Sequence, residues 1–95
     1  MIVGVLRVEL FIPEAGSLKS KRSEIRSIKE RIRRSFNASV SEIDNQDLWQ
    51  RGTLGIAVVG SSAPFVQETL DRITGFLEKN WAHLLLELSS EILHL

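Results

Sequence analysis

Residues 17–51 read SLKSKRSEIRSIKERIRRSFNASVSEIDNQDLWQR. Ser17 is suited to cap a helix, because its hydroxyl can accept a hydrogen bond from a free N–H of the first turn. The residues after it carry one apolar stripe with the 3.6-residue period of an amphipathic helix: Leu18, Ile25, Ile28, Ile32 and Phe36. The stretch therefore predicts a helix that begins after residue 17.

From residue 36 to residue 43 the period changes to two, which predicts a strand. Ala38 and Val40 face one way, and the polar Ser39 and Ser41 face the other way with Ile43. A single apolar face is typical of a strand near a sheet edge. Residues 44–47, Asp-Asn-Gln-Asp, then have the composition of a turn.

The remaining segments complete a small sheet. Residues 2–11 alternate as a strand, and residues 53–60 are apolar on both faces, which is typical of a central strand. Ser61 or Ser62 is expected to cap a second helix with Pro64 in its first turn. That helix carries the stripe Val66, Leu70, Ile73 and Leu77. Leu84, Leu86 and Leu88 begin the last strand, in which Ser89 and Ser90 are the candidate for a bulge.

The predicted order is β-α-β-β-α-β within a single domain, residues 1–95. With right-handed crossovers this order gives an α+β, ferredoxin-like fold: a four-stranded antiparallel sheet with two helices on one face. The other face would carry small and apolar residues: Val3, Val5, Phe11, Gly55, Ala57 and Val59. Such a surface predicts a second subunit, so we expect a homodimer.

Composition excludes several classes of function. The 95 residues are 43% hydrophobic and 25% charged, as in a soluble globular protein, and cysteine is absent, which excludes disulfides, thiolate metal sites and thiol catalysis. Residues 2–12 resemble neither a signal peptide nor a membrane span, so the cytoplasm is the expected location. His83 and His94 would point to opposite faces of one strand, so we expect no metal and no other cofactor.

The charge is uneven although the net charge is zero. Eight of the twelve basic residues lie between Lys19 and Arg34. A basic helix of this kind can contact nucleic-acid phosphates, or its side chains can lie in solvent and pair locally with Glu24 and Glu30. If it is functional, the nucleic-acid-binding residues are Lys19, Lys21, Arg22, Arg26, Lys29, Arg33 and Arg34. The central strands offer no aromatic residues for base stacking, so RNA would not bind there as it does in RNA-recognition domains.

The polar run 44–51 has three interpretations. Its carboxylates, together with Glu42, can hold a hard cation, or Arg51 can hold an anion beside Trp49. Alternatively these residues only build a turn, with Trp49 closing the end of the core. As a partner-binding surface the run would use Asp47, Trp49, Gln50 and Arg51, with Trp49 as the anchor.

Three stretches of this sequence resemble the YlxP-like proteins, a small bacterial family of unknown function: the opening MIVGVLRVEL, SLKSKR, and RIRRSFNASVSEIDNQDLWQRGTLGIAVV. The resemblance covers essentially the whole chain and implies a ferredoxin-like fold. Because genes of this family often lie beside those for transcription and translation factors, it also implies a connection to RNA or the ribosome. It carries over no catalytic residues.

The first functional hypothesis is a non-enzymatic module that contacts structured or ribosomal RNA through the basic helix. The alternative is a homodimeric regulatory or scaffold domain that binds a protein or small ligand through its sheet face or the turn at Trp49. Acylphosphatases have the same topology, but the junction at residues 13–18 lacks their glycine-rich loop and its arginine, so we do not expect an enzyme. Gly60-Ser61-Ser62 lacks the lysine and the length of a P-loop and is interpreted as a helix cap.

Overall fold

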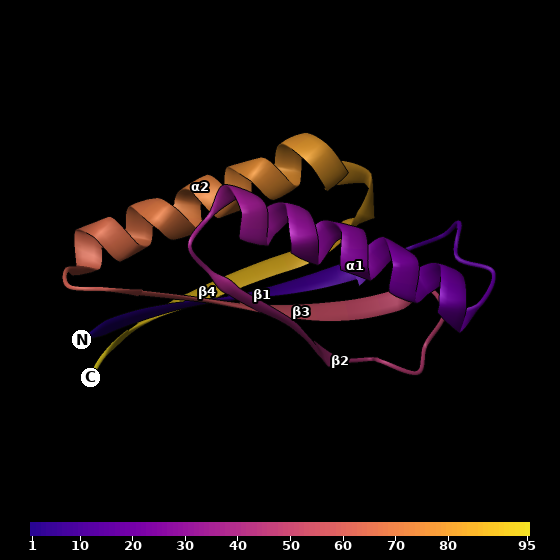
Figure 1. Cartoon of the computed structure of the whole chain (residues 1–95), viewed down its shortest axis with the longest axis horizontal. Helices are drawn as coiled ribbons and strands as arrows, with labels where there is room; N and C mark the ends of the chain where they lie inside the picture. Colours follow the sequence, from indigo (N-terminus) through magenta and orange to yellow (C-terminus); the bar gives the residue numbers. More distant parts are fainter.

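The computed structural model describes all residues, 1–95, as one sheet covered on one face by two helices (Figure 1). The strands are β1 (Ile2–Phe11), β2 (Ser39–Asp44), β3 (Arg51–Gly60) and β4 (Leu85–His94), and the helices are α1 (Leu18–Ser35) and α2 (Ala63–Trp81). A short 3-10 helix, η1 (Ala82–Leu84), joins α2 to β4. The predicted order β-α-β-β-α-β and the ferredoxin-like fold are confirmed.

All neighbouring strands are antiparallel, in the order β2-β3-β1-β4. β1 and β3 are therefore the central pair, as the two apolar faces of β3 predicted. Their register runs without interruption from Ile2 opposite Gly60 to Phe11 opposite Arg51. β2 and β4 form the two open edges.

The core lies between the sheet and the helices. Ile25, Ile28 and Ile32 of α1 are buried, as are all four residues of the predicted stripe on α2. Both predicted caps are present: the Ser17 side chain accepts from the Ser20 backbone N–H, and Ser62 accepts from Phe65, with Pro64 in the first turn of α2. Each helix therefore begins where the sequence predicted and buries the face that the sequence predicted.

Several details of the strands differ from the prediction; β3, for example, begins at Arg51 instead of residue 53. β2 begins at Ser39 instead of Phe36, because Phe36 packs against α2 in an edge-to-face contact with Phe76, with 5.4 Å between ring centroids. Ser89 and Ser90 are in register, and the irregularity in β4 lies at Leu86, which is skipped between the pairs Glu9–Glu87 and Leu10–Leu85. Leu84 belongs to η1.

The chain termini lie together at one end of the sheet (Figure 1). The Met1 amino group donates to the Leu95 carbonyl at 2.9 Å, and the Leu95 N–H donates to the Met1 carbonyl at 2.8 Å. These bonds extend the β1–β4 ladder to the last residue. Neither helix is both long and apolar enough to cross a membrane.

Gly4 is required where α2 crosses β1. A Cβ at this position would lie 2.5 Å from Cγ1 of Val66 and 2.9 Å from Cδ1 of Leu70. We expect Gly4→Ala to lower the free energy of unfolding by about 1–3 kcal/mol, because the well-packed core must move to admit the methyl group. Urea denaturation followed by circular dichroism measures this difference.

Gly75→Ala is the matched control, because a Cβ there meets no atom within 4 Å and the position is exposed on α2. This substitution should raise the stability by up to about 1 kcal/mol, since alanine is the better helix former. Equal effects of the two substitutions would contradict the close packing at Gly4.

Candidate nucleic-acid interface

α1 carries eight basic and two acidic side chains, a net charge of +6 over 18 residues. Four of the basic residues, Arg22, Arg26, Lys29 and Arg33, recur at intervals of four, three and four. This spacing places them in one stripe, about 16 Å long at 1.5 Å per residue. Lys29 is half-buried and the other three are exposed. We call these four residues the basic stripe; Lys19 and Arg34 are also exposed on this helix.

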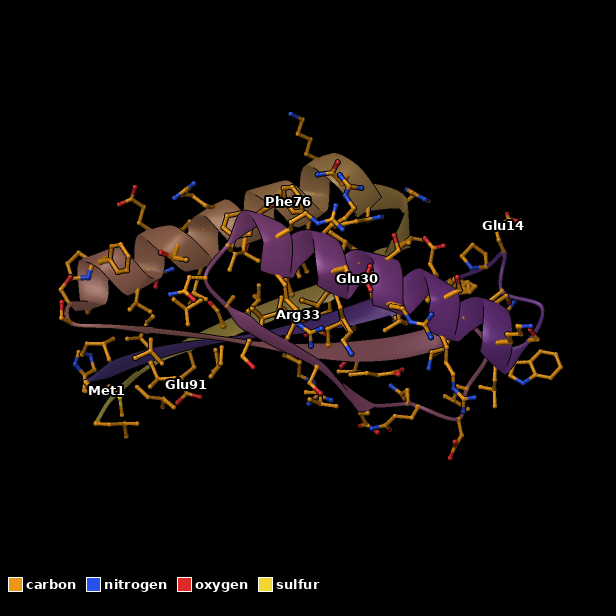
Figure 2. All side chains as sticks on the ribbon, viewed as in Figure 1. Met1, Glu14, Glu30, Arg33, Phe76 and Glu91 are labelled. Atoms are coloured by element: carbon orange, nitrogen blue, oxygen red, sulfur yellow. The ribbon has the colours of Figure 1, made fainter.

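The basic stripe lies on the flank of α1 over the edge strand β2. Arg33 Nη2 donates to the Val40 carbonyl of β2 at 2.6 Å, and in Figure 2 Arg33 lies between α1 and the strands. Arg31 is on the opposite flank, where it donates to Asn80 Oδ1 at 3.0 Å and its guanidinium lies 4.7 Å from the Trp81 ring centroid. Arg31 therefore ties α1 to α2, and the stripe faces away from α2.

The positive charges of the stripe are not neutralised locally. Every ion pair within 4.0 Å lies elsewhere: Arg7 with Glu9 and Asp44, Lys21 with Glu42, and Arg51 with Glu9. Glu24 and Glu30, which were the candidates for local pairing with the helix, hold none of these cations. The side chains remain available to an anionic partner.

Lys21 does not belong to this set, and its prediction as a phosphate contact is wrong. It is fully buried, and its Nζ donates to Glu42 Oε2 at 2.5 Å, to the Asn45 carbonyl at 2.8 Å and to the Gln46 carbonyl at 3.3 Å. These three acceptors satisfy all three ammonium hydrogens. Lys21 thus connects α1, β2 and the following loop from inside the domain.

A signal for this pair was present in the sequence. Lys21 lies four residues before Ile25, inside the apolar stripe, and Glu42 has the same strand parity as the core residue Val40. The two oppositely charged residues were therefore both on core-facing positions.

The loop between β2 and β3, residues 45–50, is held at several points. Besides the two bonds from Lys21, Asn45 Nδ2 donates to Thr53 Oγ1 at 2.9 Å. Gln50 Nε2 donates to the Pro13 carbonyl at 3.0 Å, and the Gln50 carbonyl accepts from the Ile12 N–H at 2.8 Å. The loop is thereby fixed against the first turns of α1 and against the β1–α1 connection.

Trp49 does not close the core, so the purely structural interpretation of this residue is wrong. It is 55% exposed, and the neighbouring Leu48 is 49% exposed. The second tryptophan, Trp81, is the one that belongs to the core: it is only 6% exposed and packs against Phe76. Among the other predicted partner-binding residues, Asp47 is exposed, Gln50 holds the loop, and Arg51 belongs to β3 and lies 3.9 Å from Glu9.

The cation site considered as one interpretation of this region does not form. Glu42 points to Lys21, Asp44 Oδ2 lies 3.6 Å from Arg7 Nη2, and Asp47 is not brought to either carboxylate. Asp44 turns to the helix-free face of the sheet because β2 contains a register shift between Glu42 and Asp44. There it joins a polar network with Arg7, Glu9 and Thr53, in which Thr53 Oγ1 donates to Glu9 Oε2 at 2.8 Å.

The helix-free face is only partly apolar. Its polar half is the Arg7–Glu9–Thr53 network, and its other half holds Val3, Val5 and Ala57. A groove of about 650 Å³ crosses its middle, between Ile43 and Glu91, over small side chains: Ser39, Ser41, Gly55, Ala57, Ser89 and Ser90. Figure 2 shows Glu91 on the side of the sheet away from both helices.

The two histidines are not on one uninterrupted strand, since His83 lies in η1 and His94 at the end of β4. No group of three or more histidine or acidic side chains in the structure is arranged to hold a metal ion.

A family model described as "Protein of unknown function (DUF503)" matches residues 3–89. The chain belongs to this family. It is also 42% identical over 77 residues to the "Uncharacterized protein YlxP" of Bacillus subtilis (strain 168), an alignment that covers 81% of this chain and 84% of the relative. The resemblance to the YlxP-like family is confirmed.

A solved structure, "De novo designed protein Foldit4", is similar over 99% of this chain and 97% of its own, with a TM-score of 0.56. Its sequence identity is 14%, so the similarity concerns the fold alone.

The Lys21–Glu42 pair should be essential for stability. We expect Glu42→Gln to lower the free energy of unfolding by about 3–5 kcal/mol, because it leaves a buried ammonium without its carboxylate. Lys21→Met should also destabilise the domain, and the double variant should lose less than the sum of the two single variants. Urea denaturation of the wild type, the two single variants and the double variant gives the four free energies of unfolding that a double-mutant cycle requires.

Arg26→Met provides the control, because it removes a positive charge from an exposed position of the same helix. Its effect should stay within about 0.5 kcal/mol. If Lys21→Met were no more destabilising than Arg26→Met, the buried pair would not have the role assigned to it.

Proposed function

We propose that this protein is a non-enzymatic RNA-binding module that contacts the phosphates of structured or ribosomal RNA through α1. The observation that carries the proposal is the row of basic side chains on this helix without a carboxylate partner: Lys19, Arg22, Arg26, Lys29, Arg33 and Arg34. Unpaired cations in a row release counterions when they meet a phosphate backbone, which favours binding.

The distribution of charge over the whole domain supports the same face. α2 and β4, toward the edge of the sheet opposite β2, carry five acidic side chains and only Arg72 and Lys79 as basic ones. A polyanion is therefore repelled from one edge of the domain and attracted to the other. This asymmetry orients an RNA toward the α1 side, although the net charge is zero.

Reversal of three charges in the stripe, Arg22→Glu, Arg26→Glu and Lys29→Glu, should weaken binding to transfer RNA, used as a structured polyanion. It should also reduce the slope of log K against log salt by roughly 0.7–0.9 per lost phosphate contact. Filter binding between about 50 and 200 mM salt measures both quantities.

Arg26→Glu and Lys79→Glu form a matched pair of single variants, because both residues are exposed and both substitutions change the net charge equally. Only Arg26→Glu should change the slope. An unchanged slope in the triple variant would refute the proposal. Binding to ribosomal RNA is tested by sedimentation of a cell lysate. The wild-type protein should migrate with ribosomal particles at low salt, and the triple variant should not.

A second candidate is a homodimeric scaffold or regulatory domain. It is favoured by the groove on the helix-free face and by exposed apolar surface in its lining, such as Ile43, which is 46% exposed. Small side chains along the groove would allow two such sheets to approach closely.

If the sheet face forms a dimer, sedimentation equilibrium should give twice the monomer mass of 10.7 kDa. Ala57→Arg should then produce monomers, because Ala57 lies on that face opposite Val5, whereas Gln67→Arg on the exposed surface of α2 should not. A monomer mass at all concentrations would contradict this candidate.

A further inference from the structure

Trp49 is the largest exposed side chain on a loop that the structure holds firmly. The loop receives two hydrogen bonds from the buried Lys21 ammonium and is joined to the β1–α1 connection through Gln50. An aromatic side chain on a loop that is already ordered loses little conformational freedom when it binds a partner. The Trp49 side chain can therefore bind a partner at a small cost in conformational entropy.

This loop lies at the N-terminal end of the basic stripe. Lys21, whose Nζ reaches the Asn45 and Gln46 carbonyls, is adjacent in sequence to Arg22, the first residue of the stripe. Only two residues, Asp47 and Leu48, lie between Gln46 and Trp49. A chain of phosphates that follows the stripe toward the N-terminal end of α1 would therefore approach the loop that carries the exposed Trp49.

We infer that Trp49 stacks on an unpaired base of the RNA, and that the preferred ligand is single-stranded or looped RNA rather than a continuous duplex. A basic track that ends at an aromatic side chain is the combination that single-strand binding requires: cations for the backbone and a ring for a base. In a duplex the bases are stacked on one another, so a ring at this place would gain no contact. The inference rests on the proposed function.

The stacking surface differs from the one that the fold offers in RNA-recognition domains. The middle of the sheet holds Gly55 and Ala57 beside Val5, which are too small or not aromatic. Here the base would be taken by a loop at the end of the sheet, next to the helix that holds the phosphates. Leu48, 49% exposed, adds apolar surface beside the ring.

The test is a fluorescence titration with a 12-nucleotide single-stranded RNA of mixed sequence and with the same strand annealed to its complement. Trp49 is exposed and Trp81 is buried, so a base stacked on Trp49 should quench the exposed part of the tryptophan emission. We expect quenching by the single strand, weaker binding of the duplex, and no quenching in Trp49→Leu.

Trp49→Leu should weaken single-strand binding roughly 5- to 150-fold, the range for loss of one base–aromatic stack, while Trp49→Phe should keep most of the affinity. Because the side chain is exposed, matching thermal unfolding curves of the three proteins will confirm that the fold is retained. The triple charge reversal on α1 is titrated in parallel.

The outcomes separate the inference from the proposed function. If single strand and duplex bind equally to the wild type and to Trp49→Leu, without quenching but with the salt slope that the stripe predicts, the stacking inference is wrong and the RNA-binding proposal stands. If quenching and selectivity appear but the triple reversal leaves the slope unchanged, the proposed role of the stripe is wrong. If neither RNA binds at low salt, both are wrong.

Discussion

The arrangement of α1, β2 and the β2–β3 loop depends on the buried contact between Lys21 and Glu42. A charged side chain with no exposed surface is strongly destabilising unless its hydrogens are satisfied. Here one carboxylate and two loop carbonyls satisfy them, and no buried side-chain polar atom in the structure lacks a partner. The free-energy cost of burying the charge is offset by these three hydrogen bonds, which join α1, β2 and the β2–β3 loop at one point.

That arrangement separates the basic residues of α1 into two groups with different roles. Lys21 and Arg31 point to the interior and to α2, where they connect elements of the fold. The residues of the basic stripe point outward over β2. The helix is therefore both a structural element, through its buried and α2-facing sides, and a charged surface on its remaining flank.

The same contact explains why Trp49 can be exposed without being disordered. Lys21 holds the start of the β2–β3 loop, and Gln50 holds its end. The loop residues between these two points are exposed to solvent on a backbone that is fixed at both ends. The adjacent register shift in β2 turns Asp44 away from the core face and into the Arg7 network. Glu42 and Asp44, which looked like part of one carboxylate cluster in the sequence, thereby lie on different faces and pair with different cations, Lys21 and Arg7.

The sequence by itself determined the fold. The helix stripes, the caps at Ser17 and Ser62 and the apolar faces of β3 are local patterns, and each is read from residues within one or two turns or along one strand. It also indicated the basic helix, because charge is visible in the residue list. Tertiary structure alone decided which basic residues are free, that Trp49 is exposed while Trp81 is buried, and where the strands shift register. These properties depend on contacts between residues such as Lys21 and Glu42 that are distant in the chain, and a choice among several carboxylates and carbonyls as partners is made only when the elements pack.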